Sequence, residues 1–294
     1  MSTPPLISAG TRLHVRRPEL VALDLDGTVI DSEQRLHPRT RDAVHATIEN
    51  GTTVLVVTGR MYRSALPWAS RLHVTAPLIC YQGALIREVA HNGADAGETL
   101  FEDALTPDIA LRALHVARAG GWHIQAYLDD RLLCDQDRPE AHLYARIAQV
   151  DITFVDDLAD VVAARGSTKI ACVVDDEAGA ALCEKTLRET LGAEARVTRS
   201  SPPFVEVTSP IASKGRALRR LCDKLGVDMT GVVAVGDAPN DADMLDAAGY
   251  AVAVLGAPPD VVGRVDALCA PPERAGVADV LVALGLTGAA APSG

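Results

Sequence analysis

The sequence predicts an α/β protein in which a core with a parallel sheet is interrupted by an inserted α+β domain. Buried apolar runs at Val21–Leu23, Thr53–Val57 and Pro77–Tyr81 alternate with helical segments, as in parallel βαβ units. This alternation of strands and helices changes after residue 85 and resumes after Ser209-Pro210. A length of 294 residues is enough for about two domains.

The expected boundaries follow from these changes of rhythm. Residues 20–85 and 204–286 are assigned to the core, and residues 86–203 to the inserted domain. Residues 1–19, with adjacent prolines and a small basic cluster, are expected to form a flexible leader. Residues 287–294, rich in Ala, Gly and Pro, are expected to form a disordered tail.

Each element has its own local signal. The first core helix starts at Pro38, which suits a first helical turn, and stops near Gly51. Asp129-Asp130-Arg131 separates two apolar runs of the insertion and indicates an antiparallel hairpin. Tyr127 and Trp122 are expected to pack in the core of the inserted domain rather than to contact a substrate. Further elements are expected at Met61–Leu72, Leu105–Ala119, Lys169–Val174, Ala178–Leu191, Arg196–Arg199, Phe204–Thr208, Ser213–Leu225, Val232–Val235, Ala242–Ala248, Tyr250–Val254, Ala267–Cys269 and Val277–Leu284.

Composition excludes several classes of protein. A formal charge of −11 and a pI near 5.2 argue against a nucleic-acid surface, and 3% aromatic residues argue against base-stacking platforms. The six cysteines form no C-x-x-C pair and lie mostly in apolar runs, so reduced, buried thiols are expected. With no secretion signal or membrane span in the pattern, we expect a cytoplasmic protein.

The run Val21–Leu23 ends in two carboxylates, Asp24 and Asp26, followed by Gly27. Residues two apart on a strand point to the same side, so both acids can face one point at the strand's carboxyl end. Open α/β sheets place their active sites there. Two close carboxylates repel unless a cation joins them, and oxygen ligands favour Mg²⁺. The alternative is a pair of turn-forming acids.

Three further stretches stand at the ends of expected elements: Thr58-Gly59-Arg60, Ser213-Lys214-Gly215 and Gly236-Asp237-x-x-Asn240-Asp241. Together with Asp24-x-Asp26-Gly27-Thr28, they resemble the four motifs of the haloacid dehalogenase-like (HAD) phosphohydrolases. The spacing is similar to that of the Cof-type branch, whose large cap lies between the second and third motifs. The resemblance covers residues 20–284 and implies a Rossmann-like core with an inserted cap.

The resemblance implies a role for each matching residue. Asp24 would be the nucleophile that forms an aspartyl phosphate, Asp26 the general acid and base, and Lys214 the catalytic cation. The implied metal ligands for Mg²⁺ are Asp24, Asp26 and Asp237, with Asp241 supporting them. The implied phosphate contacts are Leu25, Thr58, Gly59, Lys214 and Asn240.

Plain structural explanations remain open for three of these residues. Thr58 could cap the helix that follows it, which is compatible with binding phosphate at a helix start. Lys214 could be a solvated lysine, although a cation at a helix start is unfavourable without an anion nearby. Asp241 could cap the next helix as well as support a metal.

The sequence departs from the family pattern at two places near these motifs. Gln82 stands before Gly83-Ala84, where the family usually has Asn, so a substrate or hinge contact there is expected to differ. Leu255-Gly256 stands where the family tends toward Met-Gly-Asn, which leaves the role of that Asn without a counterpart.

The sequence thus predicts a Mg²⁺-dependent phosphatase that acts on small phosphorylated metabolites such as sugar or cofactor phosphates. A cap that roofs the site leaves little room for a polymer, so neither nucleic acid nor a membrane is expected as a partner. Two alternatives stay open: a phosphotransferase or mutase on similar substrates, and a non-catalytic protein that binds phosphometabolites. The sequence determines neither the substrate nor the oligomeric state.

Overall fold

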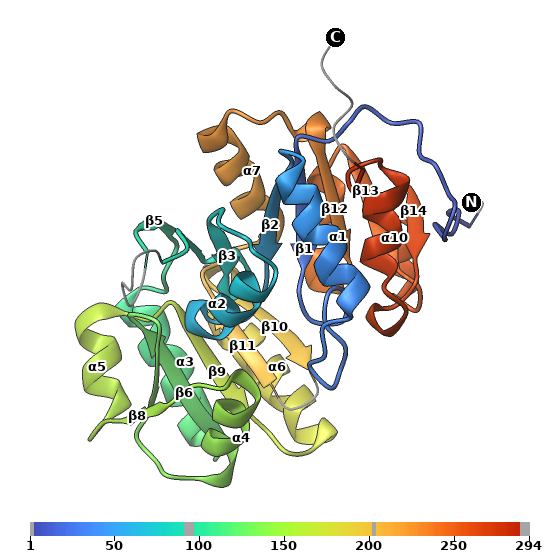
Figure 1. Cartoon of the computed structure of the whole chain (residues 1–294). Helices are drawn as coiled ribbons and strands as arrows, with labels where there is room; N and C mark the ends of the chain where they lie inside the picture. Colours follow the sequence, from blue (N-terminus) through green and yellow to red (C-terminus); the bar gives the residue numbers. More distant parts are fainter. Residues whose placement is uncertain (1–2, 91–96, 202–203, 289–294) are drawn as a thin grey trace.

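The computed structural model describes residues 3–90, 97–201 and 204–288. Within these ranges the chain forms two β-sheets, each in its own α/β layer arrangement (Figure 1). The larger sheet belongs to the core domain, and the smaller sheet belongs to the inserted domain, called the cap below. The expected α/β class with a parallel-sheet core is confirmed.

The core sheet contains eight strands among the described residues, and its centre is β1, which carries Asp24 at its carboxyl end. Strands β14 to β3 are parallel, and β4 and β5 extend the sheet as antiparallel strands. In sheet order the strands are β14 (Ala267–Cys269), β13 (Tyr250–Val254), β12 (Val232–Gly236), β1 (Leu20–Asp24), β2 (Thr53–Val57), β3 (Leu78–Cys80), β4 (Leu85–Arg87) and β5 (Thr99–Glu102).

Alternation along β1 explains why both faces of the core sheet are covered. Val21 and Leu23 pack into one apolar cluster, and Leu20 and Ala22 pack into another on the opposite face. Helices α1 (Pro38–Glu49), α2 (Tyr62–Arg71) and α10 (Gly276–Ala283) contribute to the first cluster. Helices α7 (Lys214–Leu225), α8 (Ala242–Ala247) and α9 (Pro259–Val262) contribute to the second.

The cap sheet is mainly antiparallel and contains six strands in the described part of the chain. Its order is β10 (Arg196–Ser201), β11 (Phe204–Thr208), β9 (Lys169–Val173), β6 (His123–Leu128), β7 (Arg131–Cys134) and β8 (Ile152–Phe154). The expected hairpin is β6–β7, with Asp129 and Asp130 in its turn at φ of 51° and 56°. Tyr127 is fully buried, as expected of a packing residue.

The cap helices lie on both faces of this sheet. Helices α3 (Pro107–Ala119), α5 (Leu158–Arg165) and α6 (Glu177–Leu191) pack on the face away from the core. Helix α4 (Pro139–Ala148) packs on the other face, where its residues join the same apolar cluster as β1. Helix α4 was not among the expected elements, although Pro139 at its first turn is a start signal.

The sheet pairing shifts the expected domain boundaries at both ends of the insertion. The sequence places residues from 86 onward in the insertion, but β4 pairs with β3 and β5 pairs with β4, so both strands belong to the core sheet. Strand β11 was assigned to the core, but it pairs with β9 and β10 in the cap sheet. We therefore propose that the cap spans residues 103–208, between the last core strand and the return to α7.

The leader was expected to be flexible, but its described residues attach to the core. Leu6 forms a parallel bridge with Leu268 of β14, and the Ile7 N–H donates to the Leu268 carbonyl oxygen. Ile7 is 2% exposed within the main apolar cluster. The apolar side chain of Ile7 explains the difference, because it gives the leader a site in the core. The expected disordered tail falls mostly on residues 289–294, which lie outside the described ranges.

One residue of the cap hairpin ties the cap to the core. The Asp130 carboxylate accepts hydrogen bonds from the N–H groups of Tyr62 and Arg63 at 2.9 and 2.8 Å, in the first turn of α2. It also accepts from the Tyr81 hydroxyl at 2.7 Å. Within α2 itself, the N-cap residue Met61 provides no side-chain acceptor. The cap therefore supplies the capping carboxylate for a core helix.

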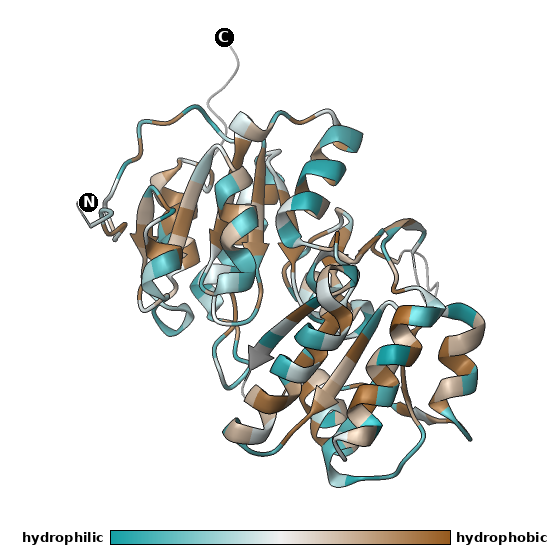
Figure 2. Cartoon of the chain, turned by 180° about the vertical axis from the view of Figure 1, so that it is seen from behind, coloured by the Kyte–Doolittle hydropathy of each residue, from teal (hydrophilic) through white to brown (hydrophobic). Residues whose placement is uncertain are grey.

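Figure 2 shows apolar residues on the strands of both sheets and on the helix faces that cover them. The six cysteines are free and buried, as expected. Among the helices in the described ranges, none is both long and apolar enough to span a bilayer.

Replacement of Ile7 by Ala tests the attachment of the leader. The buried side chain leaves a cavity, so we expect Ile7→Ala to lower the free energy of unfolding by about 2–4 kcal/mol. Its neighbour Leu6 is 51% exposed, so Leu6→Ala should change this free energy by less than about 0.5 kcal/mol. Urea unfolding measures both values, and equal small effects would show that the leader is loose in solution.

Replacement of Asp130 by Asn tests the contact between cap and core. The amide has one acceptor oxygen in place of the two that accept from four donors in Asp130, so we expect Asp130→Asn to lower the free energy of unfolding by about 1–3 kcal/mol. The Tyr62 and Arg63 amides should also exchange hydrogen faster. Asp129→Asn is the matched control, because the Asp129 carboxylate is exposed and bonds Arg165 within the cap. Identical behaviour of the two variants would contradict the capping role.

Candidate active site

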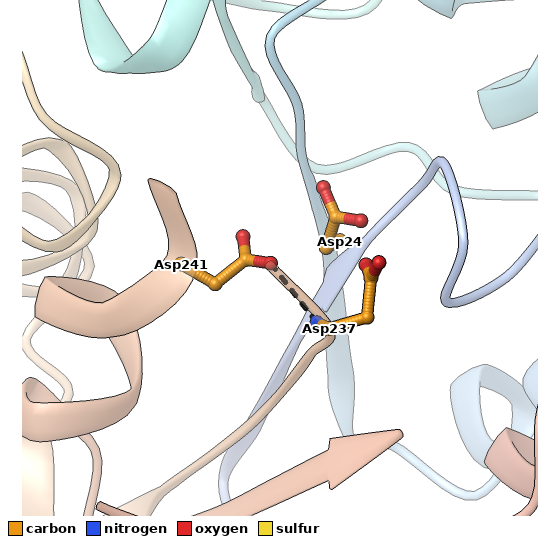
Figure 3. A group of neighbouring side chains, drawn as sticks. All are labelled: Asp24, Asp237 and Asp241. Atoms are coloured by element: carbon orange, nitrogen blue, oxygen red, sulfur yellow. Dashed lines mark hydrogen bonds between the residues drawn. The ribbon is translucent and has the colours of Figure 1, made fainter. Parts of the chain in front are cut away.

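Three carboxylates meet at the carboxyl ends of β1 and β12 (Figure 3). Asp24 ends β1, Asp237 follows β12, and Asp241 lies in the next turn, Pro239–Asp241. Each offers one oxygen to a group whose ligand atoms all lie within 4.8 Å of one another. Gly27 permits this approach, since a Cβ there would lie 2.5 Å from an Asp237 oxygen.

Lys214 joins two of these acids from the start of α7. Its Nζ donates to Asp24 Oδ1 at 2.5 Å and to Asp241 Oδ1 at 2.6 Å, and its side chain is 1% exposed. The alternative of a solvated lysine is therefore wrong. Although burial alone would lower the pKa of Lys214, the carboxylates of Asp24 and Asp241 raise it above its ordinary value.

The acids are crowded enough to disfavour their own ionisation. Burial, followed by the nearby Asp241 carboxylate, raises the pKa of Asp24 well above its ordinary value. Burial and Asp241 also raise the pKa of Asp237, although the Thr28 hydroxyl donates to Asp237 Oδ1 at 2.9 Å. A second cation beside Lys214 would stabilise the ionised forms.

The donor set fits Mg²⁺. All three groups are carboxylates, and among the described residues no donor reaches Oδ2 of Asp24 or Oδ2 of Asp237. Asp241 differs, because Lys214 occupies its Oδ1 while the N–H groups of Asp237 and Ala238 donate to its Oδ2 at 3.0 Å each. Asp24 and Asp237 are thus the acids free to bind a cation directly, and Asp241 supports them and also caps its turn.

Asp26 is also expected to bind the metal, but its carboxylate lies outside the group formed by Asp24, Asp237 and Asp241. Its side chain is 50% exposed and pairs with Arg60 through two hydrogen bonds of 2.8 and 2.6 Å. Asp26 and Arg60 both line the same cavity as Asp24. The Asp26 carboxylate therefore lies in the same cavity as Asp24 but outside the group of three acids.

The residues expected to contact phosphate lie near the carboxyl ends of the core strands, where the three acids meet. Thr58 is buried, and its hydroxyl accepts from the Arg60 N–H at 3.1 Å; the helix cap is Met61, so Thr58 does not cap α2. Gly59 lines the cavity, and a Cβ there would meet the Gln82 amide at 2.3 Å. Leu25 is fully buried, and its carbonyl accepts from two N–H groups of the following turn.

Gln82 connects the core site to the cap. It adopts φ of 58° and is 6% exposed. Its Oε1 accepts from Asn240 Nδ2 at 3.0 Å, and its Nε2 donates to Glu206 Oε2 of β11 at 3.2 Å. Glu206 in turn accepts from Lys169 Nζ of β9 at 2.5 Å. The other departure, Leu255-Gly256, follows β13 and borders a neighbouring hollow with Gly27 and Asp237.

A cavity of about 420 Å³ lies between these two parts of the molecule. Its core side carries the acids and Gly59, and its cap side is formed by residues of α4, β9 and β11. The volume is that of a site for a small molecule. Arg60, Lys169 and Glu206 also line this cavity and were not expected as site residues. Arg60 lies within a motif, but Lys169 and Glu206 have no local signal in the sequence.

Comparison with known proteins agrees with this geometry. Residues 21–281 match the family of haloacid dehalogenase-like hydrolases. The HMP-PP phosphatase of Cronobacter sakazakii is 32% identical over 257 residues, which cover 84% of this chain and 87% of that protein.

Solved structures show the same fold. TM0651 from Thermotoga maritima is 26% identical with a TM-score of 0.79, covering 90% of this chain and 97% of that one. The HAD subclass IIB sugar phosphatase BT4131 shares the fold with a TM-score of 0.77 at 17% identity, covering 91% and 99% of the two chains. The chain therefore belongs to the haloacid dehalogenase-like hydrolases and is an enzyme of their Cof-type phosphatase branch.

Proposed function

We propose that this enzyme hydrolyses phosphomonoesters of small metabolites through an aspartyl phosphate on Asp24, with Mg²⁺ as its cofactor. The observation that carries the proposal is Asp24, which lines the cavity between core and cap and is joined behind it to Asp241 by Lys214. Phosphoryl transfer requires mainly positioning and neutralisation of charge, and this arrangement supplies both.

The covalent step would use Asp24. Its carboxylate forms a bond to phosphorus while the bond from phosphorus to the leaving oxygen breaks. Lys214 holds Asp24 in position and neutralises charge that the phosphate brings. Thr58, the backbone at Leu25 and Gly59, and Asn240 would contact the phosphate oxygens, because they surround the same edge. Bound Mg²⁺, held by Asp24 and Asp237, would stabilise the negative charge of the transferring group.

Asp26 would move the protons. It donates one to the leaving oxygen in the first step and takes one from the water that hydrolyses the aspartyl phosphate. In the structure Asp26 is held by Arg60, whose side chain is 11% exposed at the cavity. An incoming phosphate is a competing anion for Arg60, so substrate binding would release Asp26 for proton transfer.

The substrate is expected to be a small phosphorylated metabolite, since the cavity between core and cap has a volume of about 420 Å³. HMP-PP, after which the Cronobacter relative is named, is one candidate at 32% identity. A cytoplasmic location agrees with reduced, buried cysteines. A phosphotransferase or mutase would need an acceptor alcohol in place of water, and a binding protein would not need Asp26.

Phosphate release from a panel of sugar phosphates, nucleotides, cofactor phosphates and HMP-PP tests the proposal. We expect release with Mg²⁺ and none with EDTA, because the acids need a second cation. Asp24→Asn should lower kcat by at least about 10³-fold, since it removes the nucleophile. Asp42→Asn, at an exposed position of α1, is the control that keeps full activity. Undiminished release by Asp24→Asn would exclude Asp24 as the nucleophile.

The role of Asp26 predicts a dependence on the leaving group. Asp26→Asn should lower kcat/KM for an alkyl phosphate by about 10²–10⁴-fold, because an alkoxide needs a proton as it leaves. The loss for p-nitrophenyl phosphate should be much smaller, since its leaving group is already a stable anion. Steady-state rates with both substrates measure this difference, and equal losses would argue against proton donation by Asp26.

A further inference from the structure

Gln82 lies where the core side and the cap side of the cavity meet. Its side chain is buried and lines the cavity. Its backbone N–H donates to the Thr58 carbonyl oxygen at 3.2 Å, and its side-chain amide lies against Gly59. Tyr81 and Gln82 have φ of 52° and 58°, which residues other than glycine rarely adopt. A strained turn therefore holds Gln82 against one of the stretches expected to contact phosphate.

The side-chain amide of Gln82 reaches a second such stretch. Its Oε1 accepts from Asn240 Nδ2 at 3.0 Å, and its Nε2 donates to Glu206 Oε2 of the cap at 3.2 Å. The other oxygen of Glu206 accepts from Lys169 Nζ at 2.5 Å. These four side chains line the same cavity. They form one chain of hydrogen bonds that runs from the cap to the core.

The chemistry of this chain fixes each donor and acceptor in it. The Lys169 ammonium group has only donors, and the Glu206 carboxylate has only acceptors. Glu206 therefore turns the NH₂ group of Gln82 toward itself. The amide oxygen of Gln82 then faces Asn240 and selects its NH₂ group. A reversed amide at Gln82 would bring two acceptors together at one end and two donors together at the other.

The orientation of the Asn240 amide determines what it offers a phosphate. An amide nitrogen carries two hydrogens, so Nδ2 can donate one to Gln82 and the other to a phosphate oxygen. In the reversed orientation the Asn240 oxygen would take the place of Nδ2 and repel the anion. Within the described part of the chain, only Gln82 bonds the Asn240 side chain. The orientation of Asn240 therefore depends on this contact.

We infer that the chain from Lys169 to Gln82 is a hydrogen-bond relay that holds the NH₂ group of Asn240 toward the phosphate. Its members are positioning residues, which act through Asn240 rather than on the substrate. Because the relay starts in the cap, the seating of the cap on the core sets one contact at the phosphate site. The inference rests on the proposed function, which takes Asn240 as a contact of the phosphate.

Two other roles for the cap residues make different predictions. Lys169 and Glu206 join neighbouring strands, so they could serve stability alone. They could also contact the remainder of a substrate directly, since they line the cavity. Neither role changes the affinity for inorganic phosphate, which has no leaving group to reach the cap. The inhibition constant of inorganic phosphate against p-nitrophenyl phosphate hydrolysis, measured with Mg²⁺, therefore isolates the relay.

Replacement of Glu206 by Gln is expected to reverse the relay. Lys169 would take the oxygen of the new amide, whose NH₂ group would then face Gln82 and turn its amide around. We expect Glu206→Gln to raise the inhibition constant of inorganic phosphate by about three- to tenfold, because Asn240 loses its acceptor. In an Asn240→Ala enzyme, the same substitution should change this constant by less than about twofold, since the amide on which the relay acts is gone.

Replacement of Gln82 by Met breaks the relay without a change of charge. We expect the same rise in the inhibition constant and the same dependence on Asn240. Gln125→Met is the matched control, because Gln125 is fully buried and donates to the Tyr127 hydroxyl at 2.6 Å within the cap. Gln125 is not among the described residues that line the cavity. Its replacement should lower stability and leave the inhibition constant as in the wild type.

The outcomes separate the relay from the proposed function. A wild-type inhibition constant in Glu206→Gln and Gln82→Met, or the same rise with and without the Asn240 amide, would overturn the relay and leave phosphate release intact. If one of the two variants does not fold, the other decides. Failure of the wild-type enzyme to release phosphate from p-nitrophenyl phosphate, acetyl phosphate and the metabolite panel would overturn the proposed function and, with it, the relay.

Discussion

The ammonium group of Lys214 is the contact on which the active site depends. It reaches two buried carboxylates that come from opposite ends of the chain, Asp24 on β1 and Asp241 after β12. A buried carboxylate without a partner is costly, and these acids also repel one another. The lysine stabilises the cluster, and among the described residues its other acid, Asp237, accepts from the Thr28 hydroxyl. The side chains that stabilise this buried cluster are therefore the same ones to which we assign the chemistry.

The cap completes this site in two ways. Residues of α4, β9 and β11 form the cap side of the cavity, and the cap hairpin provides the carboxylate that caps α2. Helix α2 follows the Thr58–Arg60 loop directly, so the position of the cap is linked to the loop that would hold the phosphate. Gln82 makes a second link, between Asn240 and Glu206. Short polar contacts thus connect the cap with the core side of the cavity.

The site residues whose positions could be predicted from the sequence each have a local signal. Asp24 and Asp237 stand at the ends of buried apolar strands, and Lys214 stands at the start of a helix, so each has a local signal that predicts its position. The α/β class follows from the same alternation of strands and helices. Leu25, Thr58, Gly59 and Asn240 were placed near the phosphate by the motif alone, and their contacts with substrate remain a prediction.

The parts that could not be predicted depend on contacts between distant segments. From its neighbours in the sequence, Asp130 is predicted only as a turn residue. Its hydrogen bonds to the first turn of α2 depend on the packing of the hairpin against that helix. Glu206 and Lys169 are single charges in strands, and nothing in the sequence shows that they share a face. The same holds for the ion pair of Asp26 with Arg60 and for the boundary strand β11, whose partners lie in the cap.

The attachment of the leader has a consequence for the outer edge of the core sheet. Strand β14 is the last strand on its side, and such edges present unpaired N–H and C=O groups that can pair with another molecule. The Ile7 N–H and the Pro5 carbonyl oxygen bond both backbone groups of Leu268 at the middle of that edge. By bonding to Leu268, residues 5–7 of the leader block this edge from pairing with the sheet of another molecule. An N-terminal truncation or a fusion that removes residues 5–7 from this position would expose β14 as an edge strand that can pair with other molecules. The residues of the candidate active site would be unchanged.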